Sequence, residues 1–165
     1  MGAKRPKTIL VSSCLLGLDC RYNGVCKKNQ AVLDFLTESE WTILPVCPEQ
    51  LAGLPTPRPA TQFTCGDGDA VLNDAGEVQN NQQSNMNATF IKGAEQVLKI
   101  AGLNKCTLAI LKERSPSCGV HEIYRNGSIV PGRGVTAALL KKNGLSIYSE
   151  DDLADIQDPF FMCKG

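Results

Sequence analysis

The sequence predicts a single α/β domain with a small, mostly parallel sheet flanked by helices in a Rossmann-like arrangement. Short apolar runs rich in β-formers alternate with segments of helical periodicity along the chain. Such alternation favours parallel strands joined by right-handed helical crossovers. With 165 residues, of which 42% are hydrophobic, the chain can bury one sizeable core but is short for two. We therefore expect residues 1–165 to form one domain, preceded by a flexible basic leader over residues 1–7.

Four short runs are predicted as strands. The first three contain nearly continuous apolar residues, which is typical of strands buried on both faces of a sheet. The fourth follows the last predicted helix. These runs are Thr8–Leu16, Trp41–Val46, Cys106–Leu111 and Leu145–Ser149.

Three segments between the strands are predicted as helices. The longest of them carries apolar residues at helical spacing, and Gly102 directly after it is expected to cap its C-terminus. The predicted helices are Gln30–Glu38, Asn87–Ala101 and Thr136–Lys142.

Two excursions interrupt this alternation and are predicted to be short β-hairpins. Phe63–Val78 contains an Asp-Ala-Gly turn at residues 74–76, and Ile123–Ile129 is hinged at Asn126-Gly127. We expect both to be small decorations on the main sheet. The biased segment NNQQSN, residues 80–85, is predicted to be a solvated loop.

The charge balance disfavours nucleic acid as a partner. Seventeen basic residues offset seventeen acidic ones, so the chain has no net field that would attract a polyanion. A small or neutral ligand fits this composition better. No apolar run approaches the roughly 18 residues of a membrane span, and the apolar run before Cys14 is shorter than the roughly 7 residues of an export signal. A cytoplasmic location with reduced thiols is expected, and the oligomeric state stays open.

Three of the eight cysteines are predicted to lie at one edge of the sheet. Cys14 is near the end of the first predicted strand, Cys47 directly follows the second, and Cys118 is in the loop after the third. In open α/β sheets, ligands bind at the carboxyl edge where the strand order reverses. Three thiolates that meet there would form a metal site.

The cysteine spacing bears on which metal such a site would hold. The chain has no Cys-x-x-Cys pair and a single histidine, so zinc ribbons and thioredoxin-like pairs lack their signature. Dispersed soft thiolates suit an iron-sulfur cluster. With three ligands, a cubane cluster would leave one iron open as a Lewis acid.

A structural role is the competing interpretation for any of these thiols, because free cysteine often packs as a small hydrophobic residue. We assign that role to Cys65 and Cys106. Cys20, Cys26 and Cys163 are left unassigned.

Three sequence motifs resemble the bacterial thiouracil desulfidase family. They are SSCLLGLDCRYNG (12–24), PVCPEQLAGLPTPRP (45–59) and LKERSPSCG (111–119), and the similarity extends in order from about residue 9 to residue 150, including GRGVTAALL (132–140). The resemblance implies an α/β domain that holds a 4Fe-4S cluster through three cysteines, with the fourth iron free to take sulfur from a thiolated pyrimidine. The residues that match the ligand positions are Cys14, Cys47 and Cys118.

The resemblance also implies catalytic residues. Glu49 matches an acidic residue beside the second cysteine, and either Ser115 or Ser117 matches a serine of the third motif. The expected reaction is the non-redox hydrolysis of 4-thiouracil to uracil and hydrogen sulfide. In it the open iron binds the substrate sulfur and Glu49 activates water as general base. A serine hydroxyl would position that water or relay a proton, and Arg58 is a candidate for binding the substrate.

Two other functions remain open on the sequence. The chain could be a sulfurtransferase in which Cys118 carries a persulfide, or a non-enzymatic module that binds an iron-sulfur cluster.

Overall fold

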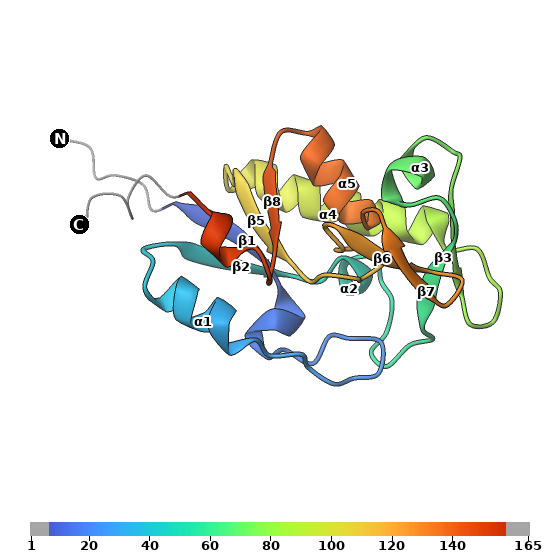
Figure 1. Cartoon of the computed structure of the whole chain (residues 1–165), viewed down its shortest axis with the longest axis horizontal. Helices are drawn as coiled ribbons and strands as arrows, with labels where there is room; N and C mark the ends of the chain where they lie inside the picture. Colours follow the sequence, from blue (N-terminus) through green and yellow to red (C-terminus); the bar gives the residue numbers. More distant parts are fainter. Residues whose placement is uncertain (1–6, 158–165) are drawn as a thin grey trace.

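The computed structural model describes residues 7–157 of the chain. Two four-stranded sheets and the helices between them make up this part of the molecule (Figure 1). Residues 1–6 of the predicted leader and Cys163 lie outside the described residues. The elements in order are β1 (Thr8–Ser12), η1 (Ser13–Leu16), α1 (Gln30–Thr37), β2 (Thr42–Val46), α2 (Pro48–Leu51), β3 (Thr61–Cys65), α3 (Gly68–Leu72), β4 (Glu77–Asn80), α4 (Asn87–Leu103), β5 (Leu108–Leu111), β6 (Glu122–Arg125), β7 (Ser128–Pro131), α5 (Val135–Lys142), β8 (Ser146–Ser149) and η2 (Leu153–Asp155).

The first sheet is entirely parallel and confirms the predicted fold class. Its strand order is β2-β1-β5-β8, so the chain moves outward from β1 to β2 and then returns to the other side of β1. The run that starts at Thr8 leaves the sheet after Ser12, and Ser13–Leu16 forms a 3₁₀ turn instead of more strand. β1 and β5 are buried as predicted. β2 is an edge strand with exposed Thr42 and Pro45, because the sheet continues on one side of it only.

Helices cover both faces of this sheet. α1 packs on one face through Val32 and Leu36, and its start is capped by the Asn29 side chain, which accepts from the Val32 N–H at 3.0 Å. The opposite face packs against α4 and α5, where Val97 and Leu140 meet the alternate side chains of β1 and β5.

The two predicted excursions combine into a second sheet, so they are not separate decorations. Its order is β4-β3-β6-β7, and β3 joins β6 in parallel through the Phe63–Arg125 pair. The β6–β7 hairpin turns at Asn126 and Gly127 as predicted, and both of these residues have positive φ. β3 and β4 are antiparallel as expected, but the short helix α3, capped by Asp67, connects them in place of a tight turn.

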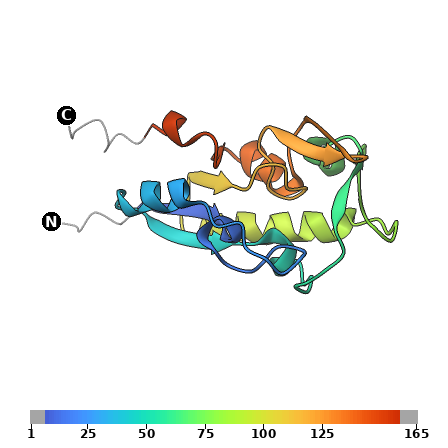
Figure 2. The same ribbon diagram turned by 60° about the horizontal axis from the view of Figure 1, so that its bottom comes forward.

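Helix α4 belongs to both hydrophobic cores. Phe90 and Ala94 pack under the second sheet, whereas Val97 and Ala101 pack under the first. Figure 2 shows the helix running along the length of the molecule. Its C-terminus differs from the prediction, since Gly102 lies within the helix. The helix ends at Leu103, two residues later than predicted, and beyond it Lys105 has a φ of 54° and the Cys106 N–H bonds to the Ala101 carbonyl at 2.9 Å.

No helix among residues 7–157 is both long and apolar enough to cross a lipid bilayer.

Candidate metal and substrate site

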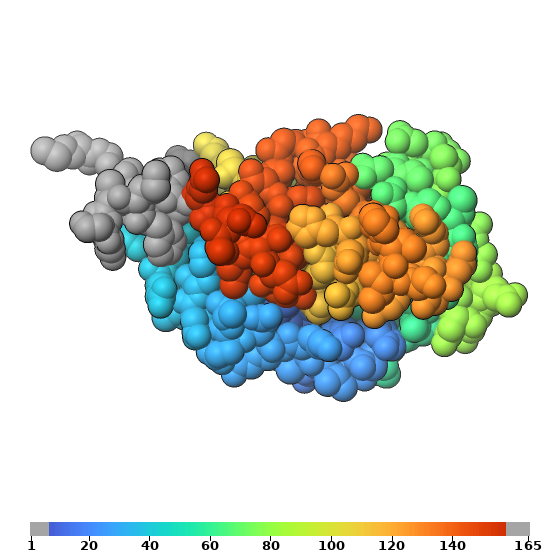
Figure 3. All heavy atoms as spheres, in the orientation of Figure 1, coloured from blue at the N-terminus to red at the C-terminus, as the bar shows by residue number. Residues whose placement is uncertain are grey.

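A cavity of about 710 Å³ opens at the carboxyl edge of the first sheet. Strand order reverses between β1 and β5, which is where ligands bind in open α/β sheets. The residues that follow β1, β2 and β5 form its floor, and residues of the loop 17–29 and of the second sheet form its walls. In Figure 3 this loop, in blue, lies along the lower edge of the molecule below the orange β6–β7 hairpin.

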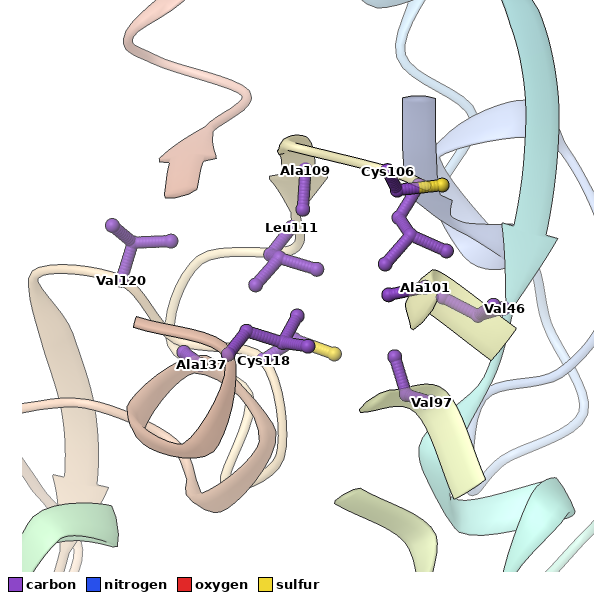
Figure 4. Packing of buried hydrophobic residues seen from close by; sticks show 11 residues of the cluster. Val46, Val97, Ala101, Cys106, Ala109, Leu111, Cys118, Val120 and Ala137 are labelled. Carbon is purple, nitrogen blue, oxygen red and sulfur yellow. The ribbon is translucent and has the colours of Figure 1, made fainter. Parts of the chain in front are cut away.

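The three predicted ligand cysteines all line this cavity. Cys14 lies in the 3₁₀ turn η1 that ends β1, and Cys47 is the N-cap residue of α2, directly after β2. Cys118 lies in the loop after β5 and is 4% exposed. In Figure 4 the Cys118 side chain lies below Leu111 and beside Ala137, and its sulfur points toward Val97. The sheet therefore brings together three thiols that are far apart in sequence.

A buried carboxylate holds the loop that carries Cys118. Glu113 is 6% exposed, and its Oε1 accepts backbone N–H groups at 2.8 Å from Val120, 2.9 Å from His121 and 3.1 Å from Glu122. Burial alone would raise the pKa of Glu113, but these N–H groups and that of Arg114 lower it below its usual value. The sequence analysis assigned no role to Glu113, although a carboxylate two residues after a buried strand is a signal that could have indicated one.

The two candidate serines occupy different environments. Ser115 lines the cavity, and its Oγ accepts the backbone N–H groups of Ser117 and Cys118, both at 3.2 Å. Ser117 is 2% exposed, does not line the cavity, and its hydroxyl has no hydrogen-bond partner among the described residues. The Ser117 carbonyl instead accepts the Thr136 N–H at 2.8 Å at the start of α5.

Glu49 and Arg58 form an ion pair beside Cys47. The Arg58 Nη2 is 3.3 Å from the Glu49 Oε2 and donates to the Cys20 carbonyl at 2.8 Å. The Arg58 Nη1 donates to the Pro55 carbonyl and to the Thr56 hydroxyl. Because its donors are engaged within the protein, Arg58 orients the Glu49 carboxylate. Direct contact between Arg58 and a ligand stays a prediction.

Two glycines let backbone segments approach the site closely. A Cβ on Gly93 of α4 would lie 2.3 Å from the Pro48 carbonyl oxygen, and one on Gly134 would lie 2.3 Å from the Ser117 carbonyl carbon. The lack of a side chain at Gly93 thus allows the turn that carries Cys47 and Glu49 to pack against α4. The lack of one at Gly134 allows the loop that carries Cys118 to pack against the start of α5.

Cys20 is a further thiol in the cavity that the sequence left unassigned. It is 5% exposed and lines the cavity with Cys14 and Cys47, and its carbonyl accepts from the Cys47 thiol at 3.7 Å. Cys106 is buried in the core as predicted. Cys65 is exposed and donates to the Ala75 carbonyl at 3.7 Å, so it is not a buried hydrophobic residue.

The thiols of Cys20, Cys47 and Cys118 in the cavity hold their protons more tightly than free cysteine does. Burial raises the pKa of Cys118 to about 12 despite a hydrogen bond with Ser12. The pKa of Cys20 is raised to about 11, chiefly by its hydrogen bond with Cys14, and the pKa of Cys47 is raised by its hydrogen bond with Cys20 and by burial. Metal binding at these thiols would therefore release protons.

Polar side chains of the second sheet, of the segment after β4 and of the loop 17–29 line the same cavity as the cysteines. Amides dominate this wall, including part of the segment 80–85 that was predicted only as a solvated loop, and two tyrosines flank it. Amides and tyrosine hydroxyls both donate and accept hydrogen bonds, as recognition of a heteroaromatic ring requires. The residues are Gln62, Gln79, Asn80, Asn81, Gln83, Tyr22 and Tyr124.

The donor set fits a cluster better than a single ion. No three histidine, cysteine, aspartate or glutamate side chains within residues 7–157 are placed to hold one metal ion. A zinc ion needs all its sulfur ligands at about 2.3 Å from one point. A cubane cluster offers each thiolate its own iron and accepts more widely spaced ligands. Thiols on separate strand ends therefore suit a 4Fe-4S cluster.

Comparison with known proteins places this geometry in a family. The model of the 2-thiouracil desulfurase family matches residues 9–152. The chain belongs to the 2-thiouracil desulfurase family. The match confirms the resemblance of the three motifs, and it takes in both sheets, including the hairpins predicted as decorations.

Two similar proteins extend the comparison. The uncharacterized protein YbbK of Bacillus subtilis (strain 168) is 38% identical over 151 residues, which cover 90% of this chain and 99% of YbbK. A solved structure described as the 4Fe-4S-dependent thiouracil desulfidase TudS is 35% identical, with a TM-score of 0.76 over 90% of this chain and 94% of that chain.

Proposed function

We propose that this protein is a 4Fe-4S-dependent desulfidase that hydrolyses a thiolated pyrimidine base, with 4-thiouracil yielding uracil and hydrogen sulfide. The observation that carries the proposal is the convergence of Cys14, Cys47 and Cys118 with Glu49 on one cavity, in a member of the desulfurase family. TudS, the similar solved structure, is described as 4Fe-4S-dependent, which supports the choice of cofactor.

In this proposal Cys14, Cys47 and Cys118 hold the cluster. When bound, the cluster would supply one iron without a protein ligand, and this soft Lewis acid would polarise the thiocarbonyl sulfur. The reaction exchanges a carbon-sulfur double bond for a carbon-oxygen one. Water supplies the oxygen, sulfur leaves as hydrogen sulfide, and no electron is transferred.

Glu49 is the proposed general base. Its side chain is 15% exposed and lines the cavity, so water in the cavity can reach it. The carboxylate would take a proton from water as the oxygen attacks the ring carbon. The ion pair with Arg58 would hold the carboxylate in place as the proton moves.

Ser115 is the better candidate for the catalytic serine. Its oxygen already accepts two backbone N–H groups, which leaves its O–H proton free to be donated into the cavity. It could orient the attacking water or pass a proton to a ring nitrogen. Ser117 lies behind the cavity wall and contacts the start of α5, which favours a structural role.

The persulfide alternative fits the structure less well. A persulfide carrier needs an accessible thiolate, whereas Cys118 is 4% exposed and burial raises its pKa to about 12.

Anaerobic reconstitution followed by assay with 4-thiouracil and 2-thiouracil tests the proposal. We expect brown protein with about four irons per chain that releases sulfide and uracil in equal amounts. In ¹⁸O-labelled water the product uracil should carry the label, which would identify the reaction as hydrolysis. Fully loaded protein that releases no sulfide from either base would support the non-enzymatic alternative. Activity without iron would refute the cofactor assignment.

A further inference from the structure

We infer that Gln62 and Gln79 determine which base the site accepts, by binding a ring carbonyl and the ring N–H next to it. Gln62 lies in β3 and Gln79 in β4, and both side chains line the cavity. The substrates would then be thiouracil-type bases, and bases with an amino group in place of the carbonyl would be rejected. This inference rests on the proposed function and specifies the substrate class of the same site.

The two glutamines lie side by side on the cavity face of the second sheet. Gln62 and Gln79 are register partners in the antiparallel β3–β4 pair, so their side chains are neighbours on one face. The adjacent residues Phe63 and Val78 point to the opposite face, where both are fully buried in the second core. The glutamine pair is therefore one continuous part of the cavity wall.

The Gln62 amide presents hydrogen-bond donors to the cavity. Its Oε1 accepts the Gly127 N–H at 2.7 Å, in the turn between β6 and β7. Because a backbone N–H can only donate, this hydrogen bond fixes which end of the amide is the oxygen. The Gln62 Nε2 has no acceptor within residues 7–157. Its N–H groups are thus available to a ligand.

The Gln79 amide is held in the opposite orientation. Its Nε2 donates to Oε1 of Glu77, and this oxygen also accepts the Thr64 hydroxyl at 3.1 Å. Because a carboxylate accepts hydrogen bonds, the nitrogen end of the Gln79 amide must face Glu77. No donor among residues 7–157 binds the Gln79 Oε1, which is therefore the acceptor that Gln79 offers to a ligand.

A donor beside an acceptor matches one edge of a thiouracil ring. Both 2-thiouracil and 4-thiouracil carry a ring carbonyl next to a ring N–H. The carbonyl would accept from Gln62, and the N–H would donate to Gln79. In 4-thioisocytosine the thiocarbonyl is kept, but an amino group replaces the carbonyl. The Gln62 donors would then face another donor, and a donor that loses water without gaining a partner weakens binding.

The variant Gln62→Glu tests the inference in the cluster-loaded protein. Glutamate keeps an oxygen for the Gly127 N–H and replaces only the NH₂ group that would bind the base. Gln82→Glu is the matched control, because Gln82 is exposed in the segment after β4 and does not line the cavity. Sulfide release gives kcat/KM for 4-thiouracil and for 4-thioisocytosine with each protein.

The ratio of the two kcat/KM values is the deciding quantity. Wild type and Q82E should prefer 4-thiouracil by about 10²-fold or more. Q62E should lower kcat/KM for 4-thiouracil by about 10–100-fold and reduce the preference to less than about tenfold. A merely structural defect would slow both bases equally and leave the ratio unchanged. The inference is overturned if Q62E keeps the wild-type ratio, or if wild type uses both bases equally well.

Binding without turnover provides a second measurement. In the cluster-loaded Glu49→Gln background, calorimetry should show a Kd for 4-thiouracil that Q62E raises by about 10–100-fold and Q82E leaves unchanged. Gln62→Met removes the donor without adding a charge, and it should lose the same preference for 4-thiouracil. Equal affinity for 4-thiouracil with and without these changes at Gln62 would also overturn the inference.

The outcomes separate this inference from the proposed function. Cluster-loaded wild type that releases no sulfide from 4-thiouracil would refute the proposed function. A loaded, active protein whose preference for 4-thiouracil survives the loss of the Gln62 amide would refute only the role of the glutamine pair.

Discussion

The proposed role of Glu49 as general base depends on the residues that surround it. Arg58 pairs with its carboxylate, and Arg58 is itself held by carbonyl oxygens of the Cys20 and Pro55 segments. The sequence alone identified Glu49 and Arg58 separately, but it could not show that one orients the other. A carboxylate that is already held beside the cavity loses little conformational entropy when it takes a proton, and this lowers the barrier to proton transfer.

Replacing this carboxylate should separate catalysis from cofactor binding. Glu49→Gln keeps the shape of the side chain but cannot take a proton, so kcat for sulfide release should fall by about 10²–10⁴-fold. Iron content should stay at the wild-type level. Glu122→Gln is the matched control, because the Glu122 side chain is 43% exposed and does not line the cavity. Wild-type turnover by E49Q would exclude Glu49 as the base.

The two serines of the third motif give opposite expectations. Ser115→Ala removes the acceptor for two backbone N–H groups, so the free energy of unfolding should fall by about 0.5–1.5 kcal/mol for each hydrogen bond, and sulfide release should slow. Ser117→Ala removes a buried hydroxyl without a partner in the described chain, and a group of this kind costs about 1–3 kcal/mol. S117A should therefore be at least as stable as wild type and remain active.

Urea unfolding followed by Trp41 fluorescence, together with a sulfide assay, checks both serine variants. Loss of activity in S117A with S115A unaffected would reverse the assignment.

At the scale of elements, the local sequence predicted strands and helices well but not how they end. β1 and β5 are continuous apolar runs, and their burial on both faces follows from composition. The end of α4 was wrong because Lys105, not Gly102, adopts the left-handed conformation there. Lysine carries no sequence signal for that role.

The turn that bears Cys47 and Glu49 depends on its packing against α4. Gly93→Ala would place a Cβ 2.3 Å from the Pro48 carbonyl oxygen, so α2 has to shift. We expect a loss of about 1–3 kcal/mol in the free energy of unfolding and reduced iron binding per chain. Gly102→Ala, in the same helix, meets nothing within 4 Å and should stabilise the protein by about 0.4–1 kcal/mol with full iron content. Equal iron binding by both variants would show that α2 tolerates the displacement.

The loop that carries Cys118 should depend on the ionisation of Glu113. Its folded-state pKa is lowered, so its contribution to stability is complete above the unfolded pKa of about 4.3 and is lost as pH falls through the lower folded value. Glu113→Gln removes the charge and should cost about 1.5–3 kcal/mol at neutral pH. The variant should also lose stability less steeply than wild type below about pH 5.

Urea titrations of the iron-free proteins between neutral pH and pH 3 measure both effects of E113Q, because acid would destroy a bound cluster. Parallel pH dependences in wild type and variant would exclude Glu113 as the titrating group.

At the scale of the whole molecule, the second sheet was the largest feature that the sequence did not predict. Each hairpin was visible from its turn residues, but β3 and β6 pair in register only at Phe63 and Arg125, and all contacts between the hairpins join segments about sixty residues apart. A contact of that separation leaves no local periodicity. The polar cavity wall depends on this join, and for that reason the substrate-facing side of the site was not predicted, whereas the cysteine side was.

Sharing of α4 and α5 between the two sheets leads us to expect one cooperative folding unit. Phe90 packs in the second core, and Trp41 lies beside β2 at the far edge of the first sheet. Phe90→Leu leaves a gap in the second core only and should lower the free energy of unfolding by about 1–3 kcal/mol. If α4 couples the cores, the Trp41 fluorescence transition in urea should shift by the same amount as the transition in circular dichroism.

Leu103→Ala, at an exposed position of α4, is the control and should shift neither transition by much. A Trp41 transition unchanged by Phe90→Leu would mean that the two sheets unfold separately, and residues 7–157 would then be two units and not one domain.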